Sequence, residues 1–105
     1  MKKVFISGKI TGENIYECVI KFKAAHNFIL FNDVTKFRIN EHEIIIPLFL
    51  EGIYFGVNWL DAMKICIKEL KTCSHIYMLK DWKDSKGAQI EHQFALDNNI
   101  KIVYQ

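Results

Sequence analysis

Short apolar runs along the chain predict four β-strands. The runs cover Lys3–Ser7, Asn27–Phe31, His75–Leu79 and Ile100–Tyr104. The first run has no polar residue from Val4 to Ile6, a pattern typical of a strand that is covered on both faces. This strand is therefore expected near the centre of a sheet.

Between these runs, apolar residues recur at helical spacing. The pattern predicts helices over Ile15–His26, after a cap at Asn58, and from Ser85 onward. Short helical crossovers between apolar strands favour parallel pairing and right-handed connections. The expected fold class is therefore α/β: a three-layer sandwich with a four- to five-stranded, mainly parallel sheet.

The segment from Val34 to Val57 fits neither pattern. Ile44–Leu50 is continuously apolar, but Pro47 excludes an ordinary central strand or a helix interior. Two interpretations stay open: an edge strand and loop that cover the site, or an apolar flap buried against a second subunit. We favour the second, and therefore expect a homo-oligomer.

Length and composition indicate a single domain over residues 1–105. Of the 105 residues, 50% are hydrophobic and 25% are charged, which suits one modest core. The net charge of +2 comes from lysines scattered along the chain, whereas a nucleic-acid surface would gather basic residues on one element. We therefore predict no nucleic-acid partner.

The cysteines and the first residues favour a cytoplasmic protein. Cys18, Cys66 and Cys73 are odd in number and form no Cys-x-x-Cys pair, so reduced thiols are expected rather than a disulfide framework. The apolar stretch after Lys3 ends too soon for a signal peptide or a membrane span. No membrane association is expected.

The histidines predict no metal site. They are far apart in the sequence and lack the spacing of metal ligands; they are His26, His42, His75 and His92. No cofactor is expected either.

A glycine-bearing loop, Ser7–Gly12, follows the first strand. Its glycines match neither a Walker loop nor a dinucleotide fingerprint. Ligands of open α/β sheets bind beyond the carboxyl ends of the strands, so Ser7, Gly8, Lys9 and Thr11 are candidate ligand-binding residues. A plain turn and helix cap is the alternative.

A second loop leads from Asp81 into the last helix. Ser85 is predicted to cap this helix, and Gly87 keeps the approach narrow, so that first-turn amides can face an anion. Ala88, Glu91 and Ala95 share one helical stripe, which predicts that Glu91 points inward. Alternatively, Glu91 only stabilises the positive end of the helix dipole.

Both ends of the chain carry a recognisable pattern. The opening Val4–Gly12 is one part, and the second half adds Trp59, Met63, Leu70, Cys73, Ser74, Ile76, Tyr77, Met78, Leu79, Trp82, Ser85, Gly87, Ala88 and Glu91. This combination resembles the nucleoside 2-deoxyribosyltransferase-like superfamily, particularly a small phage and bacterial branch. The resemblance leaves residues 34–57 unmatched.

The resemblance implies a flavodoxin-like sheet and chemistry at the N-glycosidic bond of a nucleoside or nucleotide. In that superfamily, the glutamate matching Glu91 attacks the anomeric carbon of the sugar. Water or another base then resolves the covalent glycosyl-enzyme intermediate. The implied activity is hydrolysis or deoxyribosyl transfer.

The same resemblance suggests how the substrate is held. Ser85, with the amides near Gly87, would hold a sugar hydroxyl or a 5′-phosphate, and Lys9 or Thr11 would close over it. In the enzyme interpretation, Trp82, or Tyr16 from the first helix, would stack on the base; a plain packing role for both rings is the alternative.

The chain departs from that branch at two acidic positions. Cys66 and Ser74 stand where the branch usually has aspartates. Asp81 or Asp84 could replace the lost acids only if their loop folds inward. Two functions therefore stay open: an N-glycosidase or transferase, and a catalytically inactive protein that binds or sequesters a nucleotide.

Overall fold

The computed structural model describes residues 2–32, 39–53 and 56–105. Its strands form one parallel sheet in the order β2-β1-β3-β4. The strands are β1 (Val4–Ser7), β2 (Ile44–Ile45), β3 (His75–Met78) and β4 (Lys101–Tyr104). The predicted α/β class with a parallel sheet is confirmed.

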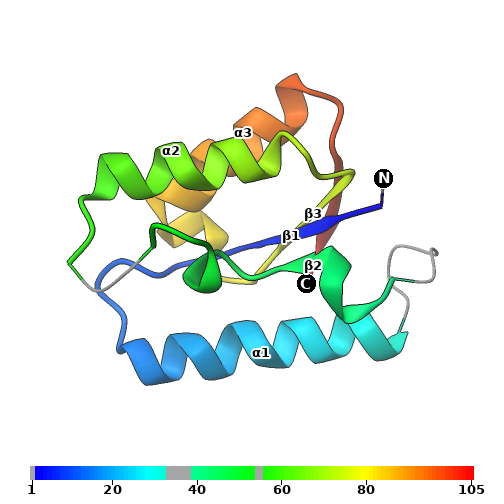
Figure 1. Cartoon of the computed structure of the whole chain (residues 1–105), viewed down its shortest axis with the longest axis horizontal. Helices are drawn as coiled ribbons and strands as arrows, with labels where there is room; N and C mark the ends of the chain where they lie inside the picture. The colour runs from blue at the N-terminus through cyan, green and yellow to red at the C-terminus, as the bar shows by residue number, and fades with distance from the viewer. Residues whose placement is uncertain (1, 33–38, 54–55) are drawn as a thin grey trace.

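In the described part of the chain, three α-helices cover the two faces of the sheet (Figure 1). The helix α1 (Ile15–Asn32) packs on one face, and α2 (Trp59–Leu70) and α3 (Lys86–Asp97) pack on the other. The described residues between these elements also form short 3-10 helices: η1 (Glu41–Glu43), η2 (Pro47–Phe49) and η3 (Trp82–Asp84). This arrangement is compatible with a flavodoxin-like three-layer fold.

The strand β1 supplies side chains to both layers of the core. Val4 and Ile6 pack toward α1, and Phe5 packs toward α2 and α3. Because side chains alternate along a strand, Ser7 shares the face of Phe5. The last residue of β1 is therefore directed toward α3.

The predicted strand Asn27–Phe31 is wrong, because α1 continues to Asn32. His26, expected at the end of the helix, lies inside it and is buried together with Ile29, whereas Phe31 is exposed. A continued helix keeps Ile29 on the buried face, and this packing outweighs the strand preference of the local residues. The second strand is instead Ile44–Ile45.

The described part of the poorly patterned segment follows the first of its two interpretations. Ile44 and Ile45 form the edge strand β2, and Pro47 begins η2, where its missing N–H costs no hydrogen bond. Residues 34–38 and 54–55 lie outside the described residues. The predicted contact with a second subunit stays a prediction.

The strand order places a topological switch point between β1 and β3. From β1 the chain crosses to β2 on one side, and β3 pairs with β1 on the other side. The loops after β1 and β3 therefore leave neighbouring strands in opposite directions, which opens a crevice at their carboxyl ends. No helix within the described ranges is long and apolar enough to cross a membrane.

Candidate active site

The loops that follow β1 and β3 are in direct contact. The amide of Leu79 donates to the carbonyl of Ser7 over 2.8 Å. Gly8 lies against Leu79 so closely that a Cβ on Gly8 would be 2.6 Å from Leu79 Cδ1. A glycine is thus required for this approach of the two loops.

An ion pair fixes the first loop to the second. Asp81 accepts hydrogen bonds from the Lys9 amide (3.0 Å) and from Lys21 Nζ (2.7 Å), and Lys21 Nζ also donates to the Lys9 carbonyl (2.7 Å). Burial alone would raise the pKa of Asp81, but these hydrogen bonds and the lysine charge lower it. Asp81 is therefore ionised, and it holds the two loops together.

The helix α3 begins at the predicted cap. Ser85 Oγ accepts from the Ala88 amide over 3.1 Å. The amides of Lys86 and Gly87 in the same turn have no acceptor within the described residues. They are available to an anionic ligand.

Glu91 lies one turn further along α3 and points inward, as predicted. Its side chain is buried, with 5% of the residue exposed. Ser7 Oγ donates to Glu91 Oε1 over 2.6 Å, and the Cys66 thiol of α2 is a second hydrogen-bond partner. Burial raises the pKa of Glu91 to about 7, although both hydrogen bonds oppose the rise.

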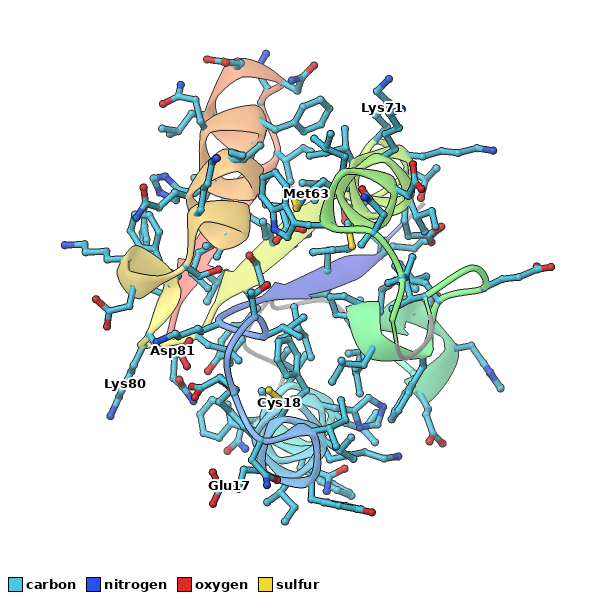
Figure 2. All side chains as sticks on the ribbon, turned by 90° about the vertical axis from the view of Figure 1, so that its left-hand side faces the viewer. Glu17, Cys18, Met63, Lys71, Lys80 and Asp81 are labelled. Atoms are coloured by element: carbon cyan, nitrogen blue, oxygen red, sulfur yellow. The ribbon has the colours of Figure 1, made fainter. Side chains whose placement is uncertain are left out.

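Glu91 lines a cavity of about 490 Å³ at the crevice. Most of the wall is apolar and comes from the first loop, α1, η2, α2 and the described residues between η2 and α2; it includes Ile10, Ile15, Val19, Pro47, Leu48, Phe49, Ile53, Val57, Trp59, Ala62 and Met63. Figure 2 looks onto the carboxyl ends of the strands and shows Met63 pointing from α2 toward α3. The volume is that of a typical small-molecule site.

A second hollow of about 350 Å³ adjoins the cavity and is more polar. It shares Thr11, Trp59, Ser85 and Gly87 with the cavity. Lys9, Asp84 and Lys86 complete its lining. One ligand can therefore place an apolar part in the cavity and an anionic part at the start of α3.

One protein-family model matches nearly the whole chain. A family model described as "Domain of unknown function (DUF4406)" matches residues 2–104. The chain belongs to this family. Neither a curated protein nor a solved structure matches it.

The DUF4406 fold brings most of the predicted site residues together. Gly8, Thr11, Ser85, Gly87 and Glu91 line the cavity, and Lys9 lines the adjoining hollow. Ser7 is completely buried behind Glu91. Ser7 therefore donates a hydrogen bond to the carboxylate and does not line the cavity.

Trp82 does not join this group. Its ring stacks on His92 with centroids 4.1 Å apart, and Tyr104 lies close to both rings. Tyr16 is 77% exposed on α1. Neither Trp82 nor Tyr16 lines the cavity, so the predicted stacking of a base on either ring has no support in this placement.

The two departures from the resembling branch lie at opposite ends of the sheet. Cys66 faces Glu91, and burial with the charge of Glu91 raises the pKa of its thiol to about 12. Ser74 lies at the start of β3, where it exchanges hydrogen bonds with the backbone of Lys3. Cys66 is therefore part of the site, whereas Ser74 lies far from it.

Sequence patterns missed Lys21 and the wall that η2 contributes. Lys21 lies on the charged side of a helix pattern, and its partner Asp81 follows 60 residues later. The apolar run around Pro47 was a signal for the wall, but nothing local showed which surface it would cover. Among the described residues, no three His, Cys, Asp or Glu side chains gather to hold a metal ion.

Proposed function

We propose that this protein cleaves the N-glycosidic bond of a nucleoside or nucleotide, by hydrolysis or deoxyribosyl transfer, with Glu91 as the nucleophile. The observation that carries the proposal is the buried Glu91 carboxyl at the wall of a ligand-sized cavity. A strongly perturbed acid in a cleft is a frequent feature of active sites. The family resemblance of the sequence supports the same chemistry.

The surroundings of Glu91 suit a nucleophile. The hydrogen bond from Ser7 fixes the carboxylate, so that it meets the anomeric carbon in one orientation. The carboxylate adds to that carbon as the bond to the base breaks, and water or a second base then displaces it. Ser7 acts through Glu91 as a positioning residue.

The adjoining hollow suits the phosphate or sugar hydroxyl of the substrate. The amides of Lys86 and Gly87, the Ser85 cap and the Lys9 side chain surround it. Amides at a helix start and lysine side chains both favour an anion. The base would then occupy the apolar part of the cavity.

Binding without turnover is the second candidate function. The observation that favours it is the state of the neighbouring groups: Asp81 is paired with Lys21, and a thiol, Cys66, stands beside Glu91 where the resembling branch has an aspartate. A neutral base needs a proton as it leaves. Without a donor, the same cavity would sequester a nucleotide.

We further propose a cytoplasmic homo-oligomer. The cysteines of the described chain, Cys18, Cys66 and Cys73, are all free and buried, as expected in a reducing compartment. The outer face of α1 exposes Tyr16, Ile20, Phe28 and Phe31. An apolar surface of this kind suits contact with a second copy.

The test is base release from a panel of nucleosides and nucleotides by the protein and its Glu91→Gln variant. Because the amide cannot attack the sugar, we expect release to fall by roughly 10³-fold or more. The matched control is Glu69→Gln, the same change in an ion pair at the other end of the sheet, which leaves the rate within about twofold.

Base release that survives in Glu91→Gln would remove Glu91 as the nucleophile. If no base is released but a nucleotide raises the melting temperature, the protein is a binder without turnover. If there is neither release nor a thermal shift, both candidate functions are wrong.

A further inference from the structure

Glu91 lacks a positively charged partner within the described residues. Its two hydrogen-bond partners, Ser7 from β1 and Cys66 from α2, are both neutral. The ion pairs of the described chain join Lys3 to Glu69, and Lys21 to Glu13 and Asp81. An ionised Glu91 therefore faces the cavity with a negative charge that no side chain of the described residues compensates.

Apart from Glu91, which the proposal uses as the nucleophile, the described cavity wall also lacks a good proton donor for a departing base. Asp81 is held ionised by Lys21 at the junction of the loops. The Cys66 thiol is a very weak acid, because burial and the charge of Glu91 hold its proton in place. The rest of the wall is mostly apolar. A neutral purine or pyrimidine would have to leave as a poorly stabilised anion.

Both features are explained by one class of substrate. We infer that the preferred substrate is a nucleoside or nucleotide whose leaving ring already carries a positive charge, such as a pyridinium or an N7-alkylated purine. The ring cation supplies the missing partner for Glu91, and the ring leaves without taking up a proton. This inference rests on the proposed N-glycosidic activity and narrows its substrate.

The reaction balances without an acid. An oxygen of the Glu91 carboxylate forms a bond to the anomeric carbon as the bond from that carbon to the ring nitrogen breaks. The electron pair of the broken bond neutralises the ring cation, so the base departs neutral. Water then attacks the anomeric carbon, the ester electron pair returns to Glu91, and the proton of the water passes to solvent.

The cavity is also physically suited to a cationic heteroaromatic ring. Its apolar wall accepts a flat ring without demanding hydrogen bonds. Trp59 lines both hollows, and its indole ring offers an aromatic face on which a flat ring can stack. Attraction to Glu91 then selects a cation over a neutral ring of the same shape.

The test compares 7-methylguanosine with guanosine, two nucleosides that differ in one methyl group and one charge. Release of each base is measured with the protein and in protein-free buffer at the same pH. For each condition, the rate with 7-methylguanosine is divided by the rate with guanosine. We expect this ratio to be at least as large with the protein as in protein-free buffer. A protein that protonates the leaving base would accelerate guanosine cleavage more than 7-methylguanosine cleavage. A ratio smaller with the protein than in buffer therefore overturns the inference.

A variant at position 66 tests whether the lack of a proton donor sets the substrate preference. In Cys66→Asp, two carboxyls share a buried site, so one of them holds a proton at neutral pH. We expect guanosine cleavage to gain about tenfold or more relative to 7-methylguanosine. Cys66→Asn, of similar size but without an acid, leaves the ratio of the two substrates unchanged. Equal ratios in Cys66→Asp and Cys66→Asn overturn the inference.

A binding measurement keeps the test independent of the Cys66 variants. The protein binds 7-methylguanosine more tightly than guanosine, and Glu91→Gln removes this preference because the amide carries no charge. An unchanged preference overturns the inference. Ready release of neutral bases from the panel would sink the inference and leave the proposed function standing, whereas release from neither class sinks both.

Discussion

The two ends of strands β1 and β3 treat a glutamate differently. At the amino ends, Glu69 is neutralised by Lys3. At the carboxyl ends, the buried Glu91 has only neutral hydrogen-bond partners in the described chain. Lys3 Nζ donates to Glu69 over 2.9 Å and to Thr72 over 2.6 Å. Ser74 bonds to both backbone polar groups of Lys3. The charges of Lys3 and Glu69 are therefore compensated within this end of the sheet, without a ligand.

The carboxyl end uses similar residues in a different way. Ser7 and Glu91 are linked directly and are both buried, and the carboxyl lines a cavity. A fold gains nothing from an uncompensated buried acid, because its ionised form carries a desolvation cost. The difference teaches that pairing of charges, rather than the residue types, separates a structural end of the sheet from a candidate site.

The largest predicted difference between the two ends is in how the free energy of unfolding depends on pH. The pKa of Glu91 rises from 4.5 to about 7 on folding, because burial disfavours the charged form. The folded state therefore holds the extra proton between these values, and its stability falls as pH rises through them. From about pH 5 to about pH 8 we expect a loss of about 2 to 3 kcal/mol that Glu91→Gln does not show.

Urea unfolding at a series of pH values measures this difference. The Glu69→Gln variant serves as the control, because its acid lies at the neutralised end, and it should keep the slope of the unchanged protein. Parallel stability curves for the unchanged protein and Glu91→Gln would show that Glu91 is not desolvated on folding.

An intermediate effect tests how closely the loops of the carboxyl end are packed. Gly8→Ala places a Cβ 2.6 Å from Leu79 Cδ1 and 2.9 Å from its Cβ, so the loops must separate, at a cost of about 2 kcal/mol. Gly87→Ala is the matched control, because the atom nearest to its Cβ would be the sulfur of the flexible Met63 side chain, at 3.1 Å. Midpoints of urea unfolding compare the two, and equal losses would contradict the close contact at Gly8.

The smallest effect is expected at the amino end. Lys3→Met removes the ion pair with Glu69, which is partly exposed, and should cost about 1 kcal/mol or less. Lys64→Met, at an exposed position on α2, controls for the loss of a surface charge. Thermal unfolding and base release are measured together, and a change in base release with Lys3→Met would mean that the two ends are coupled.

Local patterns were sufficient where local contacts decide the structure. Asn58 and Ser85 cap α2 and α3 as predicted, because a cap needs only the amides of the next turn. The strands β1 and β3 were identified from apolar runs that are fully buried. The strand predicted at Asn27–Phe31 failed, because its branched and aromatic residues suit a helix as well once one face is packed.

By itself, the sequence determined the α/β class, the helix starts and the inward direction of Glu91, since each follows from spacing within one element. Only the tertiary structure decided that Cys66 faces Glu91, that Ser74 lies at the opposite end, and that η2 closes the cavity. These relations depend on strand order and on which face each crossover covers. The contacting residues are far apart in the sequence, so no local pattern carries that information.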